Sequence, residues 1–250
     1  MLIQWFPGHM AKAMRKTEED LKLCDGVIYV LDARAPYACF NKKLTALFKN
    51  KPVVYCVNKC DTVSTASLGI ISEELKKAGL NYCLTDGLSK KDVAKLKSAC
   101  ESVMKERIER DKAKGIKRAL RFMVAGIPNT GKSTIINTIS GGKRAETGDK
   151  AGVTRANKWI RLGDFELLDT PGTMPPSFEN QTYAKHLAYI GSLNDDILDT
   201  EGLALELIGE LKIIAPDKLM EKYSLTSLDK EPLALYDDIC KRRGFLLRGG

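Results

Sequence analysis

Residues 126–133 of this chain have the types and spacing needed to hold the phosphates of a nucleotide. They read Gly-Ile-Pro-Asn-Thr-Gly-Lys-Ser and match the phosphate-loop pattern G-x-x-x-x-G-K-[ST]. The backbone N–H groups of such a loop, together with the N-terminus of the next helix, can bind phosphate oxygens. We expect an exposed loop in which Lys132 reaches the β- and γ-phosphates and acts in catalysis, while the Ser133 hydroxyl binds Mg²⁺. The other candidate nucleotide-binding residues of this segment are Asn129, Thr130, Gly131 and Thr134.

A second group, Asn58-Lys59-Cys60-Asp61, has the form N-K-x-D and follows the apolar run 52–57. A carboxylate at Asp61 can accept hydrogen bonds from N1–H and N2–H₂ of guanine, a donor pair that adenine lacks. We therefore expect GTP to be selected over ATP. Lys59 is expected to pack its stem along the base or the phosphate loop. The candidate guanine-side residues are Asn58, Lys59, Cys60, Asp61, Thr85 and Asp86.

The pattern D-x-x-G, which can sense a metal ion and a γ-phosphate, starts at Asp149, Asp169 and Asp199. Only Asp169 directly follows a strand-like run, residues 165–168, so we choose that match. Asp169 is then expected to hold Mg²⁺ through water, and the Gly172 N–H to contact the γ-phosphate. Many signalling GTPases place a water-orienting glutamine after this glycine. Thr173 is too short for that task, so hydrolysis is either slow or uses another group.

A glycine-rich, polar segment at residues 148–155 lies between these two motifs. Thr154 stands directly before the strand candidate 157–162, where a switch-loop threonine would bind Mg²⁺ and the γ-phosphate. Thr138 falls in a predicted helix and Thr147 lies farther from the strand, so Thr154 is the preferred metal ligand. A plain loop threonine is the alternative.

The elements that must position these residues alternate between strands and helices, which predicts an α/β fold with a mostly parallel sheet. We expect strands at 27–31, 52–57, 121–125, 157–162 and 165–168, and helices at 9–23, 41–49, 72–77 and 90–114. Pro175 and Pro176 interrupt the chain. Beyond them we expect only helices, at 182–190, 195–213 and 216–222. The predicted domains are therefore residues 1–176, which bind the nucleotide, and a small all-helical domain of residues 177–250.

The charge of the chain favours a polyanionic partner. The 250 residues carry a formal net charge of +8, and residues 105–121 hold eight basic side chains against three acidic ones. A solvated helix face is the ordinary alternative for such a segment. Seven cysteines without a C-x-x-C pair indicate a reduced, cytoplasmic protein. The apolar runs are too short to span a bilayer, and no signal peptide is recognisable.

The motif order N-K-C-D, G-I-P-N-T-G-K-S, D-T-P-G resembles that of the circularly permuted GTPases, because the guanine motif comes first instead of last. Three further segments resemble the YlqF/RbgA branch of ribosome biogenesis GTPases. They are Gln4-Trp-Phe-Pro-Gly-His-Met10, Asp32-Ala-Arg-Ala-Pro36 and Arg242-Arg-Gly244. Thr173 departs from the family, which usually has an apolar residue there. Its members also usually continue beyond the position of Gly250, so the C-terminal domain is expected to be a shortened one.

This resemblance implies a circularly permuted P-loop GTPase that binds ribosomal RNA and acts on the late precursor of the large ribosomal subunit. It implies slow GTP hydrolysis that ribosomal particles stimulate, and contact of the C-terminal helical domain with ribosomal RNA. It further implies a catalytic role for His9 in place of the missing glutamine. Through Asn129 it suggests potassium-assisted hydrolysis in addition to Mg²⁺.

Other functions remain open on the residues alone. A regulatory GTPase that acts on a protein effector would carry the same motifs. A nucleotide kinase would share the phosphate loop but would leave N-K-x-D without a purpose. His9 could also be a capping or packing residue, and Trp5 and Phe6 could anchor the N-terminal segment instead of stacking on RNA bases.

Overall fold

The computed structural model describes residues 3, 9–142, 158–175 and 177–245. The chain divides into two compact units, Leu2–Leu193 and Asn194–Gly250. Within the described ranges, no helix is both long and apolar enough to cross a membrane.

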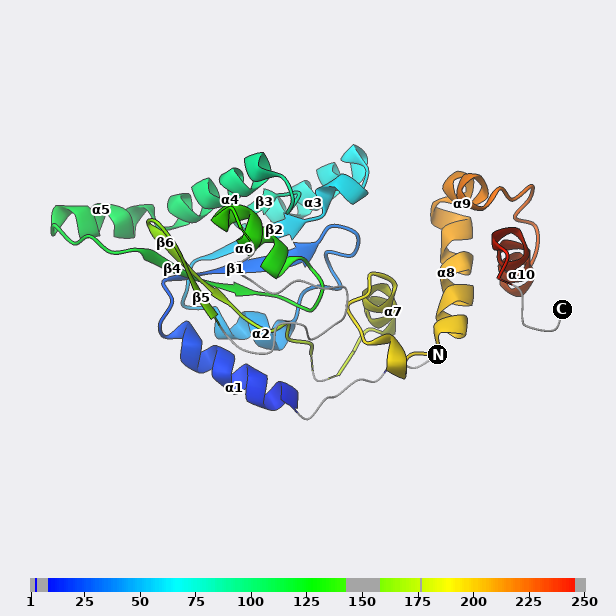
Figure 1. The fold of residues 1–250 in the computed structure, drawn as a ribbon, viewed down its shortest axis with the longest axis horizontal. Coiled ribbons are helices and arrows are strands. Elements are labelled where there is room, and N and C mark those ends of the chain that lie inside the picture. The colour runs from blue at the N-terminus through cyan, green and yellow to red at the C-terminus, as the bar shows by residue number, and fades with distance from the viewer. Residues whose placement is uncertain (1–2, 4–8, 143–157, 176, 246–250) are drawn as a thin grey trace. The chain divides into compact units, whose positions relative to one another are not determined.

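The larger unit is built on one six-stranded sheet whose spatial order is β3-β2-β1-β4-β6-β5 (Figure 1). Its strands are β1 (Gly26–Asp32), β2 (Val53–Asn58), β3 (Tyr82–Leu84), β4 (Leu120–Ala125), β5 (Lys158–Leu162) and β6 (Phe165–Asp169). All neighbouring pairs are parallel except β5 with β6. The predicted α/β fold with a mostly parallel sheet is confirmed. Because helices cover both faces, the central β1 is buried along its whole length, as its apolar sequence Val-Ile-Tyr-Val-Leu requires.

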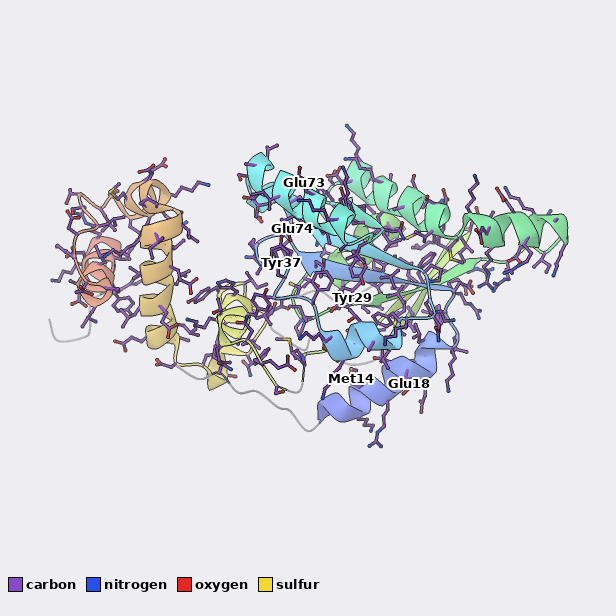
Figure 2. The ribbon with its side chains drawn as sticks, turned by 180° about the vertical axis from the view of Figure 1, so that it is seen from behind. Met14, Glu18, Tyr29, Tyr37, Glu73 and Glu74 are labelled. Atoms are coloured by element: carbon purple, nitrogen blue, oxygen red, sulfur yellow. The ribbon has the colours of Figure 1, made fainter. Side chains whose placement is uncertain are left out.

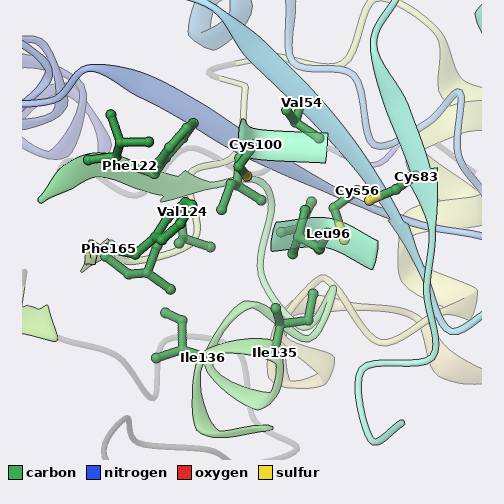
Figure 3. Close-up of a cluster of buried hydrophobic side chains, with 14 of the residues drawn as sticks. Val54, Cys56, Cys83, Leu96, Cys100, Phe122, Val124, Ile135, Ile136 and Phe165 are labelled. Atoms are coloured by element: carbon green, nitrogen blue, oxygen red, sulfur yellow. The ribbon is translucent and has the colours of Figure 1, made fainter. Parts of the chain in front are cut away.

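Helices α4 (Lys90–Val103) and α6 (Lys132–Ser140) pack on one face of the sheet and enclose its main core. Figure 3 shows this core, in which Leu96 and Cys100 of α4 and Ile135 and Ile136 of α6 meet side chains of the strands. The rings of Phe122 and Phe165 stack at 5.8 Å between centroids. This packing fixes α6, and with it the loop that precedes α6, against the sheet.

Helices α1 (His9–Leu21) and α2 (Lys42–Leu47) lie on the opposite side of the sheet, as Figures 1 and 2 both show. Tyr29 of β1 points toward α2, where its hydroxyl accepts from Asn41 N at 3.0 Å and donates to Cys39 O at 2.9 Å. The Asn41 side chain caps α2 by accepting from Leu44 N. The segment that follows β1 is thereby held in one conformation.

The remaining helices show where the sequence-based assignment was incomplete. The expected helix 90–114 is broken at Met104 into α4 and α5 (Lys105–Ala113), and α3 (Thr65–Lys77) is longer than expected. Neither β3 nor α10 (Pro232–Arg243) was predicted.

The division between the two units falls later in the chain than the predicted boundary after residue 176. Helix α7 (Gln181–Tyr189) belongs to the larger unit, where its Ala184 and Leu187 are buried. Its first residue, Gln181, exchanges two hydrogen bonds with the backbone of Ile3. The expectation that α7 starts the helical domain is therefore not met by the packing.

The smaller unit is all-helical in its described part, as expected. It contains the short 3₁₀ helix η2 (Asp195–Ile197), α8 (Thr200–Ile214), α9 (Pro216–Tyr223) and α10. Its own core joins α8, α9 and α10 through Ile208, Leu219 and Leu235, together with Leu225 just beyond α9.

Candidate functional site

The phosphate-loop residues form a tight turn between β4 and α6. Gly126, Asn129 and Gly131 have φ of 145°, 59° and 92°, which are conformations that favour glycine or asparagine. A Cβ at Gly126 would stand 2.6 Å from Val30 O of β1, so this position admits only glycine. The sequence folds into this loop because glycine or asparagine stands at each of these three positions of positive φ.

Lys132 is the first residue of α6 and lies inside the loop. It is only 6% exposed, and its Nζ donates to Ile127 O at 2.7 Å. Burial lowers the pKa of this ammonium to about 8, while the nearby Asp169 carboxylate opposes the shift. Since Ile127 and Thr130 are also fully buried, the expectation of an exposed loop is wrong. Packing of the loop against β1, β2 and the segment after β6 explains the difference.

Ser133 and Asp169 come together at the carboxyl ends of β4 and β6. The Ser133 hydroxyl donates to Asp169 Oδ2 at 3.1 Å, although 36 positions separate them. A hydroxyl and a carboxylate are oxygen donors of the kind that Mg²⁺ prefers, and Mg²⁺ sites commonly combine one or two carboxylates with substrate phosphates. Within the described residues there is no cluster of three or more His, Cys, Asp or Glu side chains that could hold a metal without such phosphates. The adjacent hydroxyl and carboxylate oxygens of Ser133 and Asp169 fit Mg²⁺ as it binds beside phosphates.

The guanine motif is joined directly to the phosphate loop. Asn58 is the last residue of β2, and its Nδ2 donates to Thr130 O at 2.9 Å. Lys59, in a left-handed conformation with φ of 61°, donates from Nζ to Asn129 O at 2.6 Å. Two motifs about 70 positions apart thus share hydrogen bonds. The Lys59 side chain was expected along either the base or the phosphate loop. In the structure, its ammonium binds the phosphate loop.

The other guanine-side candidates divide into an exposed group and a supporting one. Asp61 lies exposed in the short 3₁₀ helix η1 (Cys60–Thr62). Thr85 is fully buried, accepts at its carbonyl from Cys60 N at 3.1 Å and donates from Oγ1 to Val57 O at 3.2 Å. Asp86 is half-buried, and its Oδ1 accepts from Leu88 N at 2.9 Å. Asp61 is thus the more exposed of the two carboxylates in this group.

Asp32 is a part of the site that motif reasoning did not include. It ends β1 beside Asn58, is fully buried, and binds the Arg34 guanidinium at 2.8 and 2.9 Å and Lys59 Nζ at 2.9 Å. Burial alone would raise the pKa of this carboxyl, but the hydrogen bonds from Arg34 and Lys59 outweigh burial and lower it. The sequence marked the segment Asp32-Ala-Arg-Ala-Pro36 only through a family resemblance. Its position after an apolar strand was the available signal.

Gly172 and Thr173 pack against the phosphate loop from the other side. A Cβ at Gly172 would lie 2.6 Å from the Pro128 backbone, and Thr173 N donates to Gly126 O at 3.2 Å. Thr173 is 3% exposed, and its hydroxyl donates to Pro171 O at 3.3 Å. Its hydroxyl thus binds the backbone of its own motif, which agrees with Thr173 not being a water-orienting group.

A segment after α7 also reaches the loop, and nothing in the sequence suggested it. Ser192 is fully buried and donates from Oγ to Pro128 O at 2.9 Å. The Asn129 side chain donates from Nδ2 to Gly191 O, and Arg34 Nη2 donates to Ile190 O at 3.2 Å. Gly191 and Ser192 therefore lie against one side of the phosphate loop, while Ile190 binds Arg34.

For three of the predicted site residues, the structure gives little or no information about the side chain. Thr134 is half-buried in the first turn of α6. His9 is the first residue of α1, and its side chain is outside the described part of the chain. Thr154 lies outside the described residues altogether.

Comparison with known proteins agrees with this geometry. A family profile described as "50S ribosome-binding GTPase" matches residues 121–227. The chain is 38% identical to Ribosome biogenesis GTPase A of Bacillus licheniformis over 252 aligned residues, covering all of this chain and 89% of that protein. It is 31% identical to Mitochondrial ribosome-associated GTPase 1 of Ictalurus punctatus, over 88% of this chain and 72% of that protein. A GNP-bound crystal structure of YlqF from Thermotoga maritima superposes with a TM-score of 0.65 at 26% identity, covering 96% of this chain and 86% of that one.

Proposed function

The chain belongs to the ribosome biogenesis GTPase A family of circularly permuted GTPases, and from this premise we propose how it binds and hydrolyses GTP and what it acts on. The enzyme is a GTPase that acts in ribosome assembly. The proposal concerns the roles of its residues, its metal ions and its particle partner.

One observation carries the assignment of the nucleotide site. The phosphate loop and the N-K-x-D motif, which have no sequence proximity, share the Asn58–Thr130 and Lys59–Asn129 hydrogen bonds. A site that reads the base and the phosphates of one nucleotide must fix the distance between two such elements. The two bonds meet that requirement directly, whereas two unrelated polar turns would have no reason to be joined.

The phosphates are proposed to lie at the N-terminus of α6. There the loop N–H groups, the helix dipole and the Lys132 ammonium all favour an anion. An added phosphate charge offsets the burial that lowers the pKa of Lys132. The guanine is proposed to be read by the exposed carboxylate of Asp61, while Asn58, Lys59 and Thr85 hold the reading loop in place.

Ser133 and Asp169 are proposed to hold Mg²⁺, Asp169 through water, with Thr154 as a further ligand. A bound Mg²⁺ would compensate charge on the β- and γ-phosphates. Around it, this chain's own groups orient the substrate: the loop backbone and Lys132 fix the phosphates, and Gly172 offers its N–H to the γ-phosphate. Asn129 is proposed as the residue through which K⁺ assists.

Water attack needs a group other than Thr173, whose hydroxyl binds Pro171 O. We propose His9, at the start of α1, for this role. Hydrolysis is expected to be slow until a partner positions His9 beside the γ-phosphate. The partner is proposed to be the precursor of the large ribosomal subunit, contacted through ribosomal RNA by the helical unit Asn194–Gly250 and by the basic segment 105–121.

The base assignment is tested by Asp61→Asn. The amide can no longer accept hydrogen bonds from both donors of guanine. It can instead donate one to O2 of xanthine, so the variant should prefer xanthine nucleotides. We expect the preference for GTP over the xanthine nucleotide to change by a factor of up to about 10⁴. Changes of this size are known for sites in which a buried polar group loses its hydrogen-bond partner. Asp217→Asn, which makes the same charge change at an exposed position in the first turn of α9, is the matched control and should keep guanine preference. Equal binding of GTP and ATP by the unmodified protein would refute the assignment.

A further inference from the structure

A small pocket lies at the edge of the sheet formed by β4, β6 and β5, on the face opposite to the core with α4 and α6. It is away from the nucleotide site. It is lined by Arg121 of β4, Trp159 and Arg161 of β5, Glu166 of β6, and Leu23 just beyond α1. The strand register places Arg121, Glu166 and Arg161 side by side in one row. Arg121 is the second residue of β4, whereas the phosphate loop follows the last one, so the pocket is at the opposite end of that strand.

Trp159 is one of the large hydrophobic side chains that the described part of the protein exposes. It is 39% exposed, while Ile160 beside it, on the other face of β5, is 3% exposed and belongs to the core. The Arg121 guanidinium lies 5.3 Å from the centre of the Trp159 ring. Leu23, 54% exposed, adds an apolar wall. The pocket thus combines an accessible ring, a stacked guanidinium and an apolar side.

The charges of the pocket are unequal. Glu166 binds Arg121 closely, at 2.7 Å from Nε to Oε2, but its second oxygen is 3.7 Å from Arg161 Nε. Two guanidinium groups therefore share one carboxylate, and Arg161, whose side chain is 78% exposed, is held only loosely. One positive charge of the cluster is available to a ligand.

These features match the chemistry of an unpaired nucleobase with its phosphate. Proteins recognise unpaired RNA bases by stacking them on aromatic rings or on arginine planes. The cavity of about 270 Å³ is slightly below the 300–1,000 Å³ usual for drug-sized ligands, so it suits one flat ring and not a whole cofactor. A protein ligand would need a larger apolar surface than Trp159 and Leu23 offer.

We propose that this pocket binds an unpaired base of single-stranded RNA, stacked against Trp159 and Arg121, with Arg161 contacting the adjacent phosphate. The proposal rests on the function proposed above, since a ribosomal particle is where such RNA is met. It adds to that function a contact made by the GTPase unit itself, at the sheet edge. The net charge of +8 supplies the general attraction to RNA on which this contact depends.

The test compares binding of a short fluorescent single-stranded RNA and of an RNA duplex, titrated with salt. Trp159→Ala should weaken single-strand binding about tenfold, as expected for one stacked base, and leave duplex binding and basal GTP hydrolysis unchanged. Trp159→Phe, which keeps a ring and the fold, should retain most of the affinity. Arg161→Gln should reduce the salt slope by about 0.7, the value for one phosphate contact to a single strand. Tyr183→Ala, which removes another exposed ring on α7, is the matched control and should change nothing.

Equal single-strand affinity in Trp159→Ala and the unmodified protein overturns the proposal. So does an equal loss for single strand and duplex, which would indicate a general electrostatic effect. Loss of binding to a ribosomal protein with unchanged RNA affinity would assign the pocket to a protein partner instead. Sedimentation with ribosomal subunits separates this proposal from the proposed function. If Trp159→Ala sediments as well as the unmodified protein and also binds single-stranded RNA normally, the pocket proposal fails. The proposed function then stands, because the unmodified protein still binds the subunits.

Discussion

The Lys132 ammonium is buried beside the Ile127 carbonyl, and burial lowers its pKa from 10.5 to about 8. Below pH 8 the lysine is protonated in both the folded and the unfolded state, so folding bears the full cost of burying the charge. That cost is on the order of 3 kcal/mol and declines as pH rises from about 8 to 10.5. Lys132, the proposed phosphate-binding lysine, is therefore expected to destabilise the folded protein, a common property of functional residues.

Lys132→Met removes the buried charge and keeps the volume of the side chain. We expect hydrolysis to be nearly abolished, because the phosphates lose charge compensation. At pH 7 and without nucleotide, the thermal midpoint should equal or exceed that of the unmodified protein by a few degrees. Calorimetry and a phosphate-release assay measure both effects. Near-normal turnover would exclude the proposed role, and a clearly lower midpoint would contradict the account of the buried charge.

Asn58 and Asp61 belong to one motif but occupy different environments. Asn58 is buried and bonded to Thr130 O, whereas Asp61 is exposed. Asn58→Ala should therefore weaken GTP and ATP by the same factor, about tenfold, because a buried carbonyl loses its donor. Competition binding with both nucleotides measures this. A change in the ratio between them would mean that Asn58 reads the base itself.

At the scale of the elements, the sequence predicted those whose residues have a strong local pattern. The strands β1, β2, β4 and β6 were predicted because apolar runs precede polar or glycine residues of the motifs and of the family segment that starts at Asp32. The strand β5 was predicted as the run that follows Thr154. The three-residue β3 was missed because it is too short to show a period, and the break at Met104 because both flanking segments favour a helix. Residues 190–192 were missed for another reason. Gly191 binds the phosphate loop through its carbonyl and Ser192 through its hydroxyl, while the Ile190 carbonyl binds Arg34. A contact made by a backbone carbonyl leaves no mark on the residue types.

The basic side chains of segment 105–121 fall into two groups, arginines in ion pairs and exposed lysines. Arg107 and Arg118 both bind Asp25 and Asp111, and Arg121 binds Glu166. These arginines hold α5 and β4 to the rest of the unit. The lysines at 112, 114 and 117 are exposed, so they are the ones suited to phosphate contacts.

Reversal of Lys112, Lys114 and Lys117 to Glu should weaken binding to ribosomal particles. The slope of log affinity against log salt should fall by about 0.7–0.9 for each lysine that binds a phosphate in the unmodified protein. Arg118→Gln is the contrasting variant. It should lower thermal stability, because Asp25 is buried beside it, and change the slope little. Salt titrations of binding to purified subunits provide both slopes, and an unchanged slope in the triple variant would mean that these lysines are a solvated face.

At the scale of the whole molecule, the nucleotide site and the helical unit are linked along the chain. Ser192 binds the phosphate loop at Pro128, and the unit Asn194–Gly250 starts two positions later. On the other side, Gly172 and Thr173 bind the same loop and precede Pro175. We hypothesise that a bound phosphate that changes the conformation of the loop also shifts the two segments that contact it, residues 172–173 and Ser192. Nucleotide state would then control how the protein holds its particle.

The most direct test of the central claim is sedimentation of the purified protein with large ribosomal subunits and their precursors. It is run with a non-hydrolysable GTP analogue, with GDP and without nucleotide. We predict binding that is several-fold stronger with the analogue, GTP hydrolysis that rises when the particles are added, and loss of the nucleotide dependence in Lys132→Met. Binding that is indifferent to nucleotide, together with hydrolysis that the particles do not stimulate, would contradict the account.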